Sequence, residues 1–378
     1  MDWLYLVYAL LATVLFFGAK AYGKGKWNDE FMSLDQTKII QGFAAICIAF
    51  HHMGQKTCAP WHKPLYIVHG LDVFVPIGYM LVGIFLFCSG FGLIKSIMTK
   101  ENYLKGFVRR RIVPLIVMFY VTEWIFLIVR FLMHEKMDGP QIFFYVIGAQ
   151  LANPNAWYVI AMPFFYLFFY FSFKYIKKKD IALLVTCLLV FAYITLGTFI
   201  DHNDWWMRGE WWYNSAHLFI LGLLFARFEE PIVKHIKKFY YIYLVLAFVG
   251  LFFFFGFGEH AKDIWSYYGE TFGADHVVLR RWGCLVPEML ASSAFVIFVF
   301  LCTMKIQLGN LALKLMGNVT LEFYLIHGLF VDLFGFDFLE VTKSLKYIRN
   351  VPLYVLVVLA CSIPATIILK LINNKVKV

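Results

Sequence analysis

Residues 39–53 read IIQGFAAICIAFHHM, an apolar run with an amide near its start and two histidines at its end. Gln41 and His52 are eleven residues apart, which on an α-helix is about 1100°, or three turns plus roughly 20°. Both side chains then lie on one face, about 16 Å apart along the axis. Polar groups inside a membrane helix usually face other helices or a cavity. The run therefore predicts a helix whose polar face could join the two sides of a membrane.

The whole chain has the composition of a membrane protein. Its 378 residues are 61% hydrophobic and 20% aromatic, with a mean hydropathy of +0.71. Long apolar runs must be helices, because lipid offers no partner to unpaired backbone groups. We expect an all-α polytopic transmembrane bundle of about eleven helices. The expected spans are 3–19, 39–53, 72–94, 112–133, 157–175, 181–200, 214–228, 239–256, 284–303, 318–336 and 351–371.

The basic residues predict an orientation. When basic residues at the span ends are counted with the adjoining connections, 23 of the 34 lysines and arginines fall after the odd-numbered spans and in the C-terminal tail, and 11 fall in the other connections. Cytoplasmic loops carry such an excess, so we expect a cell-membrane protein, bacterial in type, with its N-terminus outside and its C-terminus in the cytoplasm. The net charge of +10 then reflects topology and contact with anionic lipid, and no nucleic-acid partner is expected.

The span at 3–19 reads as a retained anchor, because Asp2 precedes it and basic residues follow it. No connection exceeds about 30 residues, so any chemistry must occur within the bundle. Six of the seven cysteines lie in expected spans and only Cys58 lies in a loop. No disulfide framework and no metal site is expected from this pattern.

Two polar features suggest chemistry. His52 could act as a general base on a hydroxyl group, although His51 and His52 could equally be an interfacial pair satisfied by backbone or water. Later in the chain, Thr320, Tyr324 and His327 lie within about 60° of one another on a helix, whereas Glu322 points elsewhere. His327 could orient a substrate or a catalytic partner, or be a core histidine. Glu123 lies in mid-span and needs a partner that the sequence does not identify.

A basic cluster follows the third expected span and ends in Arg109-Arg110-Arg111. Such a cluster can be a simple membrane anchor. Three consecutive arginines nevertheless cover about 200° of helix surface, so at least one should point toward the bundle. Because guanidinium groups bind phosphate well, the alternative is a site for a nucleotide-bearing donor that enters from the cytosol.

The order of these motifs resembles the acyltransferase 3 family of integral membrane O-acyltransferases. The pieces that carry the resemblance, over roughly residues 34 to 371, are Gln41 to His52, Phe85 to Phe91, Arg109 to Pro114, Asn155 to Val159 and Gly317 to His327. One position departs from the family pattern, since Gln41 stands where the family usually has an arginine or lysine. Lys38, three residues earlier, could substitute by extending its side chain.

The resemblance implies a ten-helix core, so we divide the chain into an additional N-terminal helix and loop, 1–32, and an acyltransferase-like domain, 33–378. It also implies transfer of an acyl group, acetyl by expectation, from cytosolic acyl-CoA as co-substrate, with no further cofactor. The acceptor would be a hydroxyl of an extracytoplasmic or lipid-linked glycan. The candidate catalytic residues are His52, His51, His327 and Tyr324, and the candidate donor-binding residues are Arg109, Arg110, Arg111, Ser89, Lys38 and Gln41.

For the acceptor, we expect contacts from Asn155 and Trp157 and from the tryptophan-rich outer loop that contains Arg208, Trp211 and Trp212. Aromatic faces and charged groups suit a sugar, although such tryptophans are more often an interfacial belt. Two other functions remain open on the sequence alone. One is a proton-coupled transporter or exporter that uses intramembrane acids and histidines. The other is a non-catalytic polysaccharide assembly partner. The protein could also form a homo-oligomer.

Overall fold

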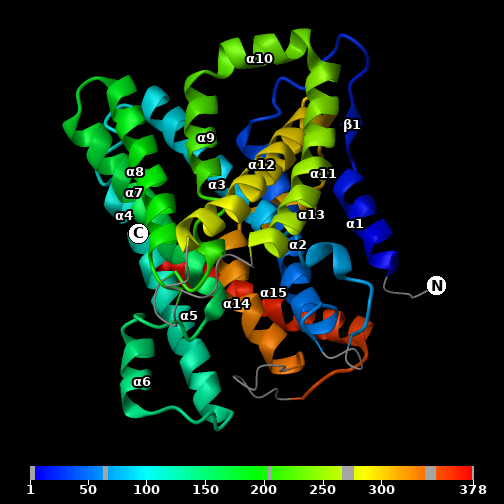
Figure 1. The fold of residues 1–378 in the computed structure, drawn as a ribbon, viewed down its shortest axis with the longest axis vertical. Coiled ribbons are helices and arrows are strands. Elements are labelled where there is room, and N and C mark those ends of the chain that lie inside the picture. Colours follow the sequence, from blue (N-terminus) through cyan, green and yellow to red (C-terminus); the bar gives the residue numbers. More distant parts are fainter. Residues whose placement is uncertain (1–4, 63–66, 203–206, 266–275, 337–345, 377–378) are drawn as a thin grey trace.

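The computed structural model describes residues 5–62, 67–202, 207–265, 276–336 and 346–376. The protein is a helical bundle (Figure 1), and each of the eleven expected spans contains a helix. These are α1 Leu6–Phe16, α2 Leu34–Thr57, α3 Gly78–Thr99, α5 Val113–Leu132, α7 Trp157–Tyr175, α8 Lys179–Phe199, α9 His217–Arg227, α11 Tyr240–Trp265, α12 Val277–Thr303, α14 Thr320–Phe334 and α15 Val351–Val376. The expected all-α polytopic fold is confirmed.

Within the described residues, seven stretches are long and apolar enough to cross a membrane by length and composition: 78–99, 107–132, 154–175, 179–199, 240–265, 277–303 and 351–376. The helices α1, α9 and α14 are shorter. Helix α2 has 24 residues but is interrupted by polar side chains, and many of its residues are buried by neighbouring helices. The helix that carries the polar face is thus enclosed by protein rather than by lipid.

Shorter elements join the long helices. Within the described ranges they include α4 Phe107–Arg111, α6 Gly139–Val146, α10 Glu229–Lys238, α13 Leu311–Gly317, the short 3₁₀ helices Asp72–Phe74 (η3), Pro154–Ala156 (η4) and Glu210–Trp212 (η5), and the strands β1 Lys20–Ala21 and β2 Ile306–Gln307. The strands pair antiparallel, with Lys20 opposite Gln307. In Figure 1, α10 lies at the top of the bundle and α6 at the bottom.

The start of α2 is fixed by local chemistry and by α13. Ser33 caps the helix by accepting a hydrogen bond from the Gln36 backbone N–H. The backbones of α2 and α13 then touch where each helix has a glycine. A Cβ on Gly42 would collide with the carbonyl oxygen of Leu313, and one on Gly317 would collide with that of Lys38. The missing side chains let α13 and the helix that follows it, α14, pack closely against α2.

Candidate functional site

One face of α2 lines a cavity. Gln41, Ala45 and Ile48 all contribute to its wall, and their spacing of four and then three residues is that of one helix face. His52 is the next position on this face, one turn beyond Ile48. The face predicted from Gln41 and His52 therefore exists, and its inner part borders the cavity.

A second polar face comes from α14. Thr320 and Tyr324 line the same cavity, and His327 lies one turn further on and is fully buried. Glu322 points away from this face, as expected. It is buried against α15, where it accepts hydrogen bonds from Lys370 and Asn373. The predicted seam on α14 thus faces α2, and Glu322 links α14 to α15.

The two faces meet at a pair of histidines. Nδ1 of His52 lies 2.7 Å from Nε2 of His327, and Nδ1 of His327 lies 2.8 Å from the carbonyl oxygen of Phe323. A carbonyl only accepts, so Nδ1 of a neutral His327 carries the hydrogen and its Nε2 is an acceptor. The hydrogen between the two rings then belongs to Nδ1 of His52. Nε2 of His52 is left with its lone pair, and no described residue makes a hydrogen bond to it.

His51 has a different position. Its Nδ1 lies 2.9 Å from the carbonyl oxygen of Phe74 in η3, and its ring occupies the space beside Gly78 at the start of α3. A Cβ on Gly78 would lie 2.5 Å from Nε2 of His51. Of the two adjacent histidines, only His52 bonds to His327, and the contacts of His51 attach α2 to the entry of α3.

The cavity has a volume of about 740 Å³, within the range of small-molecule sites. One part of its lining is apolar or neutral and consists of Ile48, Cys88, Tyr158, Met162 and Tyr324. Another part of its lining is charged, with basic and acidic side chains from Lys38, Lys95, Lys100, Arg111, Asp29, Glu30 and Glu229. The arrangement suits an elongated ligand with a polyanionic head and an apolar or neutral arm.

The three arginines separate in the structure. Arg111 lines the cavity, whereas Nη2 of Arg110 donates to the carbonyl oxygen of Tyr103, 2.9 Å away. Arg109 is exposed and is absent from the lining. All three arginines are exposed, and of the three only Arg111 borders the cavity.

The other predicted donor-side residues also border the cavity. Oγ of Ser89 lies 2.9 Å from the hydroxyl oxygen of Tyr166, and both residues line the wall of the cavity. Lys38 lines it as well, while its Nζ donates to the carbonyl oxygen of Gly317, 2.8 Å away at the end of α13. Lys38 and Gln41 thus reach one cavity from neighbouring turns of α2.

Asn155 lies beside α14, and Trp157 follows it at the start of α7. The side chain of Asn155 covers Gly328, where an added Cβ would lie 2.5 Å from its Nδ2. Trp157 is buried, and its ring centroid lies 6.4 Å from that of Trp212. Trp211 is 38% exposed. The structure therefore brings Asn155, Trp157 and Trp212 toward the bundle interior and leaves Trp211 at the surface.

Arg208 is half-buried in the segment before η5. It lies outside the lining of the cavity. If Arg208 contacts an acceptor, as predicted, it does so outside the donor-side cavity.

Glu123 has partners that the sequence did not reveal. Its carboxylate accepts hydrogen bonds from the backbone N–H groups of Ala152, at 2.7 Å, and Asn153, at 3.1 Å. The side chain of Asn153 accepts from the N–H of Asn155 and donates to the carbonyl oxygen of Leu325 in α14. Glu123 thus supports the loop that places Asn155 against α14.

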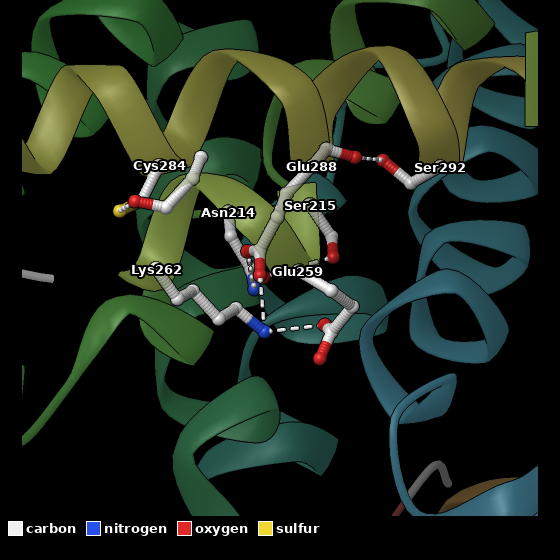
Figure 2. A network of polar contacts seen from close by, with 8 residues as sticks. Asn214, Ser215, Glu259, Lys262, Cys284, Glu288 and Ser292 are labelled. Carbon is white, nitrogen blue, oxygen red and sulfur yellow. Dashed lines mark hydrogen bonds and ion pairs between the residues drawn. The ribbon is translucent and has the colours of Figure 1, made fainter. Parts of the chain in front are cut away.

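A second polar cluster was missed by the sequence analysis (Figure 2). Glu288 in α12 is nearly fully buried, and its carboxylate lies 3.2 Å from Nδ2 of Asn214 and 3.3 Å from Nζ of Lys262. Lys262 also bonds to Glu259, one turn away in α11. A glutamate within a long apolar helix was the available signal, because it requires a partner. The cluster joins α11, α12 and the segment before α9, away from the cavity.

Among the described residues, no group of three or more His, Cys, Asp or Glu side chains could hold a metal ion. The seven cysteines all lie within the described residues, and none of them forms a disulfide.

A comparison with known protein families gives one match. Residues 33–370 match the family model described as an acyltransferase domain, which covers nearly the whole chain. The matched region begins at the cap of α2 and includes both faces that meet at His52 and His327. No curated protein and no solved structure matches the chain.

Proposed function

The chain belongs to the acyltransferase 3 family and is a membrane acyltransferase, and from this premise we propose that it transfers an acetyl group from cytosolic acyl-CoA to a hydroxyl of an extracytoplasmic or lipid-linked glycan. The observation that supports the proposal best is the convergence of the two cavity-lining faces on His52 and His327. The N-terminus would lie outside and the cavity would open to the cytosol, as the distribution of basic residues predicts.

The donor fits the cavity by charge and by shape. Its phosphates would bind Arg111 and the lysines of the lining, because hydrogen bonds between charged groups are stronger than neutral ones. Its thioester arm would extend toward Ile48 and Tyr324, one helical turn from His52. Ser89 and Tyr166 lie along this route and can donate hydrogen bonds to the polar groups of the arm.

His52 is the proposed general base. Its Nε2 would take the proton of the acceptor hydroxyl while the hydroxyl oxygen attacks the thioester carbonyl carbon. The carbon–sulfur bond then breaks, and the leaving thiolate takes the proton back from His52, so that the base is regenerated. His327 holds His52 in the required tautomer through the bond to Nδ1.

Tyr324 is the proposed oxyanion donor. Its hydroxyl is buried at the cavity wall and makes no hydrogen bond to a described residue. Its ring lies next to His327, with centroids 6.2 Å apart. An unpaired buried hydroxyl is costly in a resting protein, so a substrate oxygen that accepts from it would be favoured.

The direct test uses purified protein in proteoliposomes with acetyl-CoA, together with mass spectrometry of envelope glycans from cells that contain or lack the protein. We expect release of free CoA in parallel with acetylated glycan, and loss of both in His52→Ala. General base catalysis contributes about 10²- to 10⁴-fold to the reaction rate. A fully active His52→Ala would therefore show that His52 is not the base. Unchanged glycans in cells that lack the protein would reject the acceptor.

A further inference from the structure

The cavity stops before it reaches the two bonded histidines. Its lining comes nearest to them with one residue from each of four helices: Ile48 on α2, Val82 on α3, Tyr158 on α7 and Tyr324 on α14. The other lining residues of α2 and α14 precede these positions, and those of α3 and α7 follow them. We call these four residues the end wall of the cavity.

The end wall lies at one level of the bundle. Ile48 and Tyr324 each stand one helical turn before a member of the bonded pair, His52 and His327. The ring of Tyr158 packs edge-on against that of Tyr324, with 5.6 Å between their centroids. The starts of these turns on α2 and α14 and the start of α7 therefore meet at the same depth.

Helix α3 brings Val82 to this level as well. His51 fills the space beside Gly78, the first residue of α3. The two helices run antiparallel, since a second contact further along α2 joins it to the segment before α3. Ile48 lies about one turn before His51, and Val82 lies about one turn after Gly78. Both side chains are thus one turn away from the same contact and on the same side of it.

The end wall is tightly packed. Ile48, Val82 and Tyr324 are 2%, 6% and 8% exposed, and the ring of Tyr158 also contacts Phe85, with centroids 6.3 Å apart. Protein interiors are close-packed, so additional carbon atoms are admitted only when neighbouring side chains move. The end wall therefore gives the cavity a fixed depth, with tyrosines on its polar side and aliphatic side chains on its apolar side.

We propose that the end wall holds the acyl group of the donor, and that Ile48 and Val82 restrict this group to a short chain, with acetyl preferred over butyryl and longer acyl groups. This inference rests on the proposed function, because it places the thioester carbonyl beside Tyr324. The thioester arm fills the route by which it entered. Carbon atoms beyond the carbonyl then extend only toward Ile48 and Val82, and a longer chain collides with them.

The test measures kcat/KM for butyryl-CoA relative to acetyl-CoA, with protein in proteoliposomes and envelope glycan as acceptor. In a pocket of this kind one methylene changes specificity by about 10- to 200-fold, so wild type should use butyryl-CoA at least about 10-fold less well. Ile48→Ala removes three carbons from the end wall and leaves a cavity there. We expect it to raise the ratio at least about 10-fold. A disturbance of His52 would lower both rates and cancel in the ratio.

Two further variants grade the effect. Ile48→Val removes one carbon and should raise the ratio for propionyl-CoA more than that for butyryl-CoA. Val82→Ala enlarges the same space from α3, so it should act in the same direction as Ile48→Ala. Unchanged ratios in both Ile48→Ala and Val82→Ala would overturn the proposal.

Ile40→Ala is the matched control. Ile40 lies on α2, is 3% exposed and is outside the cavity lining, so its substitution removes the same atoms from an equally buried position. The ratio should stay within about 2-fold of wild type. A rise as large as that of Ile48→Ala would attribute the effect to a general loosening of α2 and overturn the proposal.

Calorimetric titration without acceptor separates this inference from the proposed function. Wild-type protein that binds acetyl-CoA more tightly than butyryl-CoA but transfers nothing would reject the proposed function, and a preference that Ile48→Ala removes would still support the end wall as the acyl site. Equal binding of acetyl-CoA and butyryl-CoA by wild type would overturn the inference while acyl transfer remained intact. Protein that binds neither would reject both.

Discussion

The rings of His52 and His327 are almost parallel, with an angle of 10° between their planes and 4.9 Å between their centroids. This stacking accompanies the hydrogen bond between them and restricts rotation of His52. His327 is buried and is itself held by the carbonyl oxygen of Phe323. The base is thus oriented by a chain of two hydrogen bonds that ends on the backbone.

Replacing His327 should therefore affect the rate more than binding. In His327→Leu, Nδ1 of His52 loses its acceptor, so the tautomer with a free Nε2 is no longer favoured. We expect kcat to fall by about 10²-fold, the lower end of the value of a general base, with little change in KM for acetyl-CoA. His327→Gln, which offers an acceptor oxygen, should retain more activity. Equal activity of the two variants would argue against the tautomer mechanism.

Arg111 should bind the donor more strongly than its neighbours do. Removing one hydrogen bond to a charged group costs about 1.5–3 kcal/mol, so Arg111→Gln should weaken acetyl-CoA binding by about 10- to 100-fold. Arg109→Gln is the control, since Arg109 lies outside the cavity lining whereas Arg111 belongs to it. Calorimetric titration at two salt concentrations measures both. Equal losses for the two variants would indicate a general effect of positive charge at the membrane surface.

Glu123 should act on catalysis through the loop that it supports. In Glu123→Ala, the N–H groups of Ala152 and Asn153 lose their acceptor, at a cost of about 1–3 kcal/mol for a buried group. Asn155 then loses its fixed position over Gly328. We expect lower thermal stability and lower kcat, with the dissociation constant for acetyl-CoA unchanged. Glu123→Gln keeps one acceptor oxygen and should restore most of both quantities, whereas a role in proton transfer would leave Gln as inactive as Ala.

The sequence could predict the helices and the shared faces because both depend on local period. Gln41, Ile48 and His52 repeat at helical spacing, and this places them on one face whatever surrounds them. Contacts between distant segments could not be predicted in this way. Glu123 is satisfied by amides 29 and 30 residues later, and Glu288 by Asn214, which lies 74 residues earlier. These contacts depend on how the helices pack.

The arginine run shows the same limit on a smaller scale. Helix period requires one of the three to face inward but does not say which. In the structure α4 ends at Arg111 and Tyr103 binds Arg110, and this leaves Arg111 at the cavity. Which arginine borders the cavity therefore depends on where α4 ends and on one hydrogen bond to a backbone carbonyl. Neither follows from a pattern in the sequence.

Gly42 should tolerate no side chain. Its Cβ would meet the backbone of Leu313, which cannot move without separating α2 from α13. We expect Gly42→Ala to lower the unfolding temperature and to weaken acetyl-CoA binding, because both helices position residues of the cavity. Gly256→Ala in α11 is the control, since nothing lies within 4 Å of its added Cβ and alanine favours a helix by about 1 kcal/mol. A stable, active Gly42→Ala would contradict this close packing.

Glu229 should compete with the donor for a lysine at the entrance. Lys95 at the end of α3 pairs with Glu229 at the start of α10, and both line the cavity. A phosphate that binds Lys95 has to displace this carboxylate, and the remaining negative charge repels the donor. In Glu229→Gln the competition is removed, so we expect acetyl-CoA to bind about 3- to 10-fold more tightly, consistent with the modest value of an exposed ion pair. The gain should shrink at high salt, because screening weakens the repulsion that the substitution removes. Glu230→Gln is the control, because Glu230 is the adjacent residue and lies outside the cavity lining, and it should have a smaller effect. Weaker donor binding in Glu229→Gln would show that Glu229 positions Lys95 for the phosphate instead of competing with it.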